Sequence, residues 1–217
     1  MTKAHSILNE KESQFDFLEK FALDSGAIEA KIIPAENVVV EDRVVLKCIS
    51  GCPSYKKKLN CPPYAPTVDE FRKMLKDYRF AMLVKFKTNA EIKNEDVARS
   101  LLRCQYDEEI PTPLKEEATK FMDDWKKDNR KFNQIVLEIE KTAFNNGFTF
   151  AVGFSIGSCS LCDKCSIENN VCIYPSMTRF PEHAVGVNMK RTVQEAGMTI
   201  SFPFEKIPDP VALLLID

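Results

Sequence analysis

The sequence predicts an α/β fold in which a mixed sheet is flanked by helices. Apolar residues recur at helical spacing in some segments, β-branched residues concentrate in others, and the two kinds of segment alternate along 217 residues. That length can bury a core within a single domain, 1–217. Two stretches share the order strand, cysteine loop, helix, strand, and we expect right-handed crossovers to bring both loops to one edge of the sheet.

The first elements are a helix and two strands. Residues 7–23 (ILNEKESQFDFLEKFAL) place apolar side chains at helical spacing, and Gly26 follows as a helix stop. AKII at 30–33 and VVVEDRVVLKC at 38–48 are rich in β-branched residues, which predicts strands. The second of these strands would end at the first cysteine of the chain.

A helix and an interior strand follow the first cysteine loop. Thr67 is a predicted N-cap for the helix VDEFRKMLKDY, because Glu70 lies where a capping box requires it. The run RFAMLVKF at 79–86 is almost entirely apolar, which favours a strand inside the sheet. Residues 88–115 are polar and contain two prolines, so we interpret them as a peripheral insertion.

The second half repeats this order of elements. A long helix is predicted over 114–146, ending at Asn146-Gly147, and FTFAVGFSIGSC at 148–159 is a predicted strand that runs into the second cysteine group. A helix from Pro181 to Ala196 and a strand at 198–204 come next. A last apolar run, VALLLID, occupies 211–217.

Composition excludes several classes of protein. Thirty basic and 32 acidic residues give a formal charge of −2, so no positive field extends over the chain, and we expect no nucleic-acid or membrane partner. The first residues lack the apolar core of a signal peptide, and no uninterrupted apolar run reaches membrane-spanning length. We therefore expect a cytoplasmic protein.

Cysteine is the unusual component, with eight residues in a chain expected in a reducing compartment, where thiols or metal ligands are typical. Only His5 and His183 are present, which excludes sites built from several imidazoles. Seven of the cysteines form two groups and are the predicted cofactor- and metal-binding residues: Cys48, Cys52 and Cys61, then Cys159, Cys162, Cys165 and Cys172.

The second group has the spacing C-x2-C-x2-C-x6-C, which places three thiols within seven residues. The C-x2-C-x2-C run is typical of a loop that wraps a [4Fe-4S] cluster, and in ferredoxins the fourth cysteine serves another cluster, so Cys172 need not bind the same centre. The alternatives are a four-cysteine zinc site that only stabilises the loop, and redox-active thiols.

The first group, C-x3-C-x8-C, lacks a fourth local sulfur ligand. Either Cys104 or Cys172 completes the site, or one metal corner stays open to water or substrate and acts as a Lewis acid, or the three thiols hold a purely structural metal. Cys104 lies at a helical position beside two leucines, where an ordinary buried thiol is the favoured interpretation.

Two other features bear on partners and catalysis. Lys56, Lys57 and Lys58 form a basic run inside the first cysteine loop, which is either simply solvated or docks an acidic electron-transfer protein or an anionic substrate. His183 is near enough to the second group to be a proton donor, although an exposed helix histidine is the simpler interpretation. The chain has no dinucleotide-binding or P-loop glycine motif.

The two cysteine motifs, KCISGCPSYKKKLNCPPYAPT and GFSIGSCSLCDKCSIENNVCIYP, are followed by TRFPEHAVGVNMKRTVQEAGM. In this order they resemble a family of small predicted metal-binding proteins of methanogenic archaea and anaerobic bacteria, over residues 28–217. The resemblance implies an iron-sulfur or related metal protein of anaerobic metabolism, with the seven grouped cysteines at matching positions. It implies no particular reaction. In that family a glycine often follows the tyrosine of the first loop, where this chain has Lys56.

Together these observations predict a cytoplasmic protein with one or two [4Fe-4S] clusters, acting in electron transfer. One alternative is an enzyme in which an open iron held by the first group activates a small substrate. The other is a zinc-stabilised interaction module.

Overall fold

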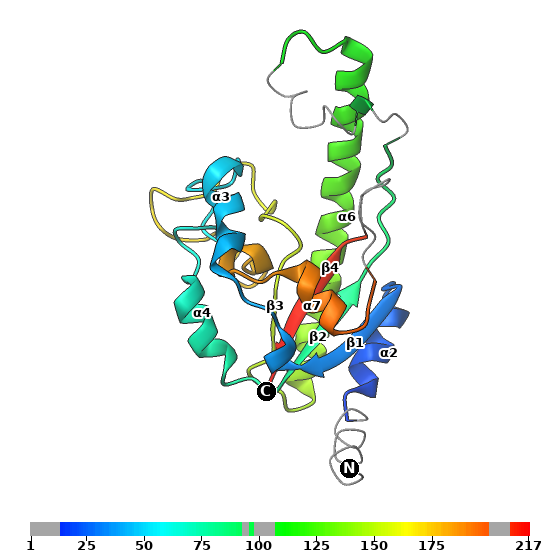
Figure 1. Cartoon of the computed structure of the whole chain (residues 1–217), viewed down its shortest axis with the longest axis vertical. Coiled ribbons are helices and arrows are strands. Elements are labelled where there is room, and N and C mark those ends of the chain that lie inside the picture. Colours follow the sequence, from blue (N-terminus) through cyan, green and yellow to red (C-terminus); the bar gives the residue numbers. More distant parts are fainter. Residues whose placement is uncertain (1–13, 93–95, 98–106, 200–208) are drawn as a thin grey trace.

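A computed structural model of the chain describes residues 14–92, 96–97, 107–199 and 209–217 (Figure 1). At its centre lies a four-stranded sheet in the order β1-β2-β4-β3, in which every neighbouring pair is antiparallel. The strands are β1 (Glu29–Pro34), β2 (Phe80–Lys85), β3 (Val152–Gly153) and β4 (Val211–Ile216). The α/β class is confirmed, whereas the sheet formed by these strands is antiparallel and not mixed.

The two inner strands carry the core on both of their faces. All six residues of β4 and the first five of β2 are buried, and their side chains alternate between two clusters because successive residues of a strand point to opposite faces. Met82 and Leu214 belong to one cluster, and Leu83 and Leu213 to the other.

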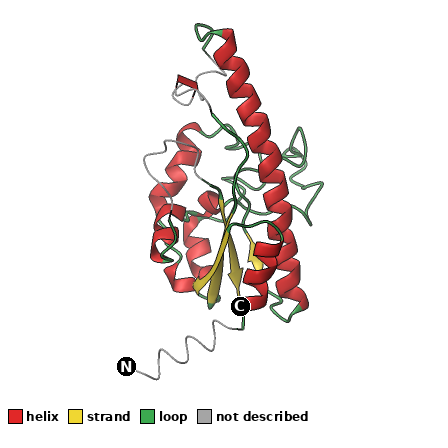
Figure 2. Ribbon diagram, turned by 90° about the vertical axis from the view of Figure 1, so that its right-hand side faces the viewer, coloured by secondary structure: helices red, strands yellow, loops and turns green. Residues whose placement is uncertain are grey.

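Helices cover both faces, which gives three layers (Figure 2). On one face, α2 (Asp16–Asp24) and the long α6 (Thr112–Asn145) bury their apolar side chains against the sheet. On the other face, α4 (Val68–Leu75), the 3-10 turn η4 (Glu182–Val185) and α7 (Met189–Glu195) pack against it. Helix α6 extends well beyond the sheet at one end (Figure 1).

Several sequence predictions are confirmed. Strand β2 lies in the interior of the sheet, and α6 ends at Asn145, immediately before Asn146-Gly147. The capping box at α4 is complete: the Glu70 amide donates to the Thr67 hydroxyl at 3.3 Å, and the Thr67 amide donates to the Glu70 carboxylate at 2.8 Å. Residues 1–13, which contain the start of the first predicted helix, lie outside the described residues.

The predicted strand at 38–48 is wrong. After β1 the chain forms the 3-10 turns η1 (Ala35–Asn37) and η2 (Asp42–Val45) and then the helix α3 (Leu46–Gly51). Only Val40 makes a strand-like bridge, with Val187. Val38 and Val44 are buried as single apolar contacts, so β-branched composition here reflects packing and not sheet pairing.

Three other boundaries differ from the predictions. Of 148–159, only Val152–Gly153 pairs as a strand. The helix predicted from Pro181 to Ala196 is interrupted by Gly186, whose φ is 87° and where an added Cβ would lie 2.8 Å from Val68. In the strand predicted at 198–204, Met198 and Thr199 are not in a strand, and the remainder lies outside the described residues. Of the predicted insertion 88–115, residues 93–95 and 98–106 also lie outside them, and α6 begins within it at Thr112.

The prediction that both cysteine loops leave the same edge of the sheet is also wrong. Strand β1 ends beside Phe80, whereas β3 runs toward Leu213, so the two strands leave opposite ends of the sheet. Parallel strands with crossover helices, on which the prediction rested, do not occur among the four strands. Residues 35–45 instead carry the chain back, and this return brings α3 and the first loop beside the second loop (Figure 1).

Candidate metal centre

The first cysteine group lies on α3 and the turns that follow it. Cys48 is on the helix, Cys52 ends it, and Cys61 is buried in the loop. Backbone hydrogen bonds hold this loop: the Lys56 amide donates to the Pro62 carbonyl at 3.0 Å, and the Cys61 amide donates to the Lys58 carbonyl at 3.1 Å. The group is therefore positioned by a tightly turned segment.

The second group lies in a long stretch between β3 and η4 that has no helix or strand. Two arginines tie this stretch to α6. Arg130 on the helix donates to the carbonyl of Ser160 at 2.8 Å, and Arg179 donates through Nε to Glu140 on the helix at 2.8 Å. A loop of this length without regular structure is uncommon and is typically functional.

The two loops, about a hundred residues apart in sequence, are in direct contact. The Ser54 and Ser158 hydroxyls are hydrogen-bonded at 2.9 Å, and the backbone amide of Leu59 donates to the sulfur of Cys165 at 3.4 Å. Asn60, which is buried, donates to the carbonyl of Arg179 at 2.9 Å. The two cysteine loops therefore lie side by side, although not at a common edge of the sheet as the sequence predicted.

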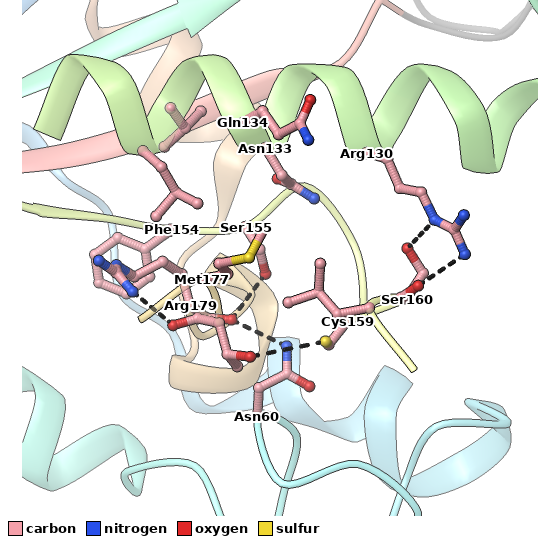
Figure 3. A pocket seen from close by; sticks show the side chains of 14 residues that line it. Asn60, Arg130, Asn133, Gln134, Phe154, Ser155, Cys159, Ser160, Met177 and Arg179 are labelled. Atoms are coloured by element: carbon pink, nitrogen blue, oxygen red, sulfur yellow. Dashed lines mark hydrogen bonds between the residues drawn. The ribbon is translucent and has the colours of Figure 1, made fainter. Parts of the chain in front are cut away.

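Figure 3 shows a place where α6 and the two cysteine loops meet. Arg130, Asn133 and Gln134 of α6 line one side of a cavity of about 80 Å³, and Cys159 and Asn60 line the other. The cavity has room for a few water molecules but not for an organic substrate. Its walls come from α6 and both cysteine loops, so the site is built from distant parts of the chain.

Cys61 has thiols of both groups as neighbours. Its pKa is raised to about 12, first by burial and then by Cys52, Cys48 and Cys159, while Lys58 opposes the rise. Of the second group, Cys159 is thus the thiol that raises the pKa of Cys61, where the sequence had suggested that Cys104 or Cys172 completes the first group. Cys104 lies outside the described residues.

Cys162 has the other thiols of the second group as neighbours. The pKa of Cys162 is raised by loss of solvent and then by Cys165, Cys159 and, more weakly, Cys172, with Lys58 again opposing. Thr178, which the sequence analysis had not singled out, joins two of these thiols: its hydroxyl lies 3.3 Å from the sulfur of Cys172 and 3.9 Å from that of Cys159.

The donor set suits a soft metal centre. All seven grouped cysteines are free thiols, and sulfur ligands select zinc, copper(I) and iron-sulfur clusters. Within the described ranges, no three Cys, His, Asp or Glu side chains are arranged so that they could hold one ion. Ligating a single ion would therefore require these side chains to move from their present positions.

A buried carboxylate next to the first group is a further residue that sequence patterns had not indicated. Glu182 is 5% exposed, and its charge raises the pKa of Cys48, after burial and Cys52. Its Oε1 atom lies 2.8 Å from Nδ1 of His183, while Oε2 has no hydrogen-bond partner within the described structure. His183 is thus half-exposed on the 3-10 turn η4 and paired, not a solitary histidine on a helix surface.

Comparison with known families decides the relationship of this chain. Residues 31–216 match the family described as predicted metal-binding protein (DUF2284). The chain belongs to this family. The match spans both cysteine loops and the whole sheet except its first residues, in agreement with the resemblance found from the motifs. No curated protein and no solved structure matches the chain.

A helix that spans a bilayer must be both long and apolar. None of the helices in the described segments is both long enough and apolar enough to span a membrane.

Proposed function

We propose that this member of a predicted metal-binding family is a cytoplasmic iron-sulfur protein that transfers electrons. The observation that carries the proposal is the contact between the two cysteine loops, in which an amide of the first loop donates to a cysteine sulfur of the second. Cys159, Cys162 and Cys165 would hold a [4Fe-4S] cluster, and Cys48, Cys52 and Cys61 a second centre or the rest of a shared one. Bound there, a cluster would supply a one-electron carrier.

The surroundings of the thiols support a redox role. Hydrogen bonds to cysteine sulfur tune cluster potentials, and Cys165 receives one from Leu59 while Cys172 has the Thr178 hydroxyl beside it. Lys58 lies near enough to both groups to lower the pKa of Cys61 and Cys162. Its positive charge would stabilise thiolate ligands in either group.

Iron-sulfur is proposed over zinc because of how the thiols are spaced. One zinc ion needs four ligands about 2.3 Å away, whereas each cysteine of a cluster binds a different iron. A loop without regular structure that carries one thiol at every third residue can wrap around a [4Fe-4S] cluster, which is larger than a single zinc ion. A zinc-stabilised module is the outcome that would replace this proposal.

An acidic electron-transfer protein is the partner we propose. Lys56 and Lys57 are exposed on the first loop, and apolar side chains are exposed on both loops: Ile49, Tyr64, Val171, Ile173 and Tyr174. The exposed lysines would attract an acidic protein and speed the encounter with it.

Anaerobic purification followed by iron and acid-labile sulfide analysis tests the metal assignment. We expect iron and sulfide in near-equal amounts and brown absorption. Cys162→Ser should lower the iron content strongly because it removes a ligand in the second group, and Cys52→Ser should do so for the first. Cys104→Ser removes the one cysteine outside both groups, which we interpret as an ordinary buried thiol, and should retain its iron; loss of iron in this variant would make Cys104 the fourth ligand of the first group. Stoichiometric zinc without iron after anaerobic reconstitution would overturn the proposal.

A further inference from the structure

A cleft of about 620 Å³ lies beside the first cysteine group and is distinct from the smaller cavity of Figure 3. Its walls come from the turn η2 and the start of α3, from η4 and α7, from Trp125 of α6, and from the chain at 209–211. This volume is within the range of pockets that bind metabolites. The metal proposed above does not occupy it, because none of the seven cysteines lines it.

Charged groups of both signs line this cleft, with nitrogen-bearing side chains slightly in excess of carboxylates: Arg43, Lys47, His183 and Lys190 against Glu41, Glu182 and Asp209. Arg43 pairs with Glu41 through Nε alone, which leaves its two terminal nitrogens as donors. Lys47 also lines the cleft and is exposed. The carboxylate of Glu41 is already neutralised, since it accepts from Arg43 at 2.6 Å and from Arg191 at 2.6 Å.

His183 adds a donor whose orientation is fixed. Its Nδ1 atom is held by Glu182 at 2.8 Å, so Nε2 is the ring nitrogen left for a ligand. The Glu182 hydrogen bond and charge raise the pKa of His183, which favours the imidazolium form. Glu182 is itself more than nine-tenths buried and keeps one oxygen without a partner in the described chain, a feature that a catalytic role or a bound group would explain.

We propose that this cleft binds a small organic anion, with Lys47 and Arg43 opposing its charge and His183 donating a hydrogen bond from Nε2. Glu182 acts as a positioning residue that fixes the imidazole. The shared chemistry is an oxyanion, carried by either a carboxylate or a phosphate. The site goes beyond the metal centre proposed above, since it takes a small molecule and not a metal.

Trp125 gives a direct measurement, because it is the only tryptophan of the chain and lines the cleft. Titrating the full-length protein with succinate or glycerol 3-phosphate should change its fluorescence saturably, and calorimetry should give the same affinity. Which of the two anions binds more tightly identifies the carboxylate or the phosphate class. Succinamide, the neutral counterpart of succinate, should not bind.

Variants locate the site. Lys47→Gln and His183→Gln should each weaken binding about tenfold, the equivalent of about 1.4 kcal/mol. Lys126→Gln is the matched control: it removes a positive charge next to Trp125 in sequence, on a side chain that does not line the cleft, and should bind normally. Glu182→Gln should weaken binding less than His183→Gln, since the imidazole remains.

Iron and sulfide content measured on the same samples separates this inference from the metal assignment. Protein that is loaded with metal but binds neither anion would overturn the anion site alone. Protein that binds an anion but no iron would overturn only the iron-sulfur proposal. Equal weakening by Lys126→Gln would show a nonspecific charge effect and would overturn the site. Binding of succinamide as tightly as succinate would show that the cleft does not recognise negative charge, and would overturn the site as well.

Discussion

Lys56 has a φ of 58°, in the left-handed region that favours glycine. The sequence resemblance had placed a glycine at this point of the first loop, and the backbone explains why: without a Cβ the turn has no steric penalty. Only Lys56 and Asn170, among the described residues other than glycine, have a positive φ. The turn between Cys52 and Cys61 therefore carries local strain in this chain.

We expect Lys56→Gly to raise the free energy of unfolding by about 0.5 kcal/mol, because relief of strain exceeds the added chain entropy. Lys57→Gly, at a neighbouring exposed position with ordinary φ, should lower it by a similar amount. Urea unfolding of both variants measures the difference. Equal destabilisation by the two changes would contradict strain at Lys56.

Glu41 makes the folding stability of the protein depend on pH in the acid range. Hydrogen bonds from Arg43, Asn188 and Arg191 lower its pKa from 4.5 to about 2. A carboxyl group with a lowered pKa in the folded state stabilises fully above its unfolded value and loses that contribution as pH falls through the folded value. The loss should therefore occur between pH 4.5 and about 2.

Unfolding measured across this pH window should show a steeper decline for the wild-type protein than for Glu41→Gln, which cannot titrate. Arg191→Gln removes one donor and should move the decline of the wild-type curve to higher pH. Parallel curves for wild type and Glu41→Gln would show that other carboxyl groups determine the acid response.

The candidate ligands could be predicted from sequence because cysteine spacing is local information. Their tertiary neighbours could not. Cys159 is the thiol of the second group that raises the pKa of Cys61, and Thr178 lies beside two thiols; both follow from how distant loops fold together. Glu182 could not be recognised either, since burial of one carboxylate leaves no periodic pattern in a sequence.

At the level of elements, prediction succeeded where one physical signal dominated. The apolar stripe of α6, the capping box of α4 and the continuous apolar run of β2 each specify their structure locally. The prediction of a strand at 38–48 failed because valine side chains can be buried in turns as well as in a strand. The run at 211–216 became the inner strand β4, and only tertiary pairing with β2 identifies it.

Helix α6 supports the second cysteine loop through one ion pair. Glu140 and Arg179 are 16% and 21% exposed, and Glu140 also accepts from the backbone amide of Gly153 at 2.7 Å. Glu140→Gln would leave the Arg179 charge uncompensated in a largely buried position. We expect a loss of about 2 kcal/mol in the free energy of unfolding.

Glu138→Gln is the control for this change. It lies on the same helix and breaks an exposed pair with Lys141, so it should cost less than about 0.5 kcal/mol. Denaturant unfolding gives both values, and cleavage of the 157–180 segment by a protease should be faster in Glu140→Gln alone. Equal stability of the two variants would show that the ion pair does not hold the loop.

Across the whole molecule, two units that each contain a strand, a cysteine loop and a second strand form the sheet, but with other strands than the sequence predicted: β1 takes the place of 38–48 and β4 that of 198–204. Each unit contributes its first strand, β1 or β3, to an outer position and its second, β2 or β4, to an inner one, and each pair is antiparallel. If β1 is exchanged with β3 and β2 with β4, the sheet therefore keeps the same strand order and the same antiparallel pairing. The loops still meet on one side because residues 35–45 reverse the path of the first unit.

As far as the described residues go, neither apolar core contains any of the seven grouped cysteines, so the sheet and the thiol loops are held together by different interactions. Loss of metal should leave the sheet folded and release only the loops. Hydrogen exchange should show protected amides in β2 and β4 with or without metal, because these strands are buried on both faces. Amides at 52–66 and 157–180 should become protected only on loading.

Metal that binds only the folded protein also stabilises it, by about 2.7 kcal/mol at a free concentration one hundred times the dissociation constant. Cys162→Ser should lose the loop protection and part of this stabilisation while its sheet amides exchange as in the wild type. Because the two regions are read in one experiment, the sheet serves as an internal control. Exchange of the β2 and β4 amides at unfolded rates in metal-free protein would mean that the cores alone cannot hold the fold.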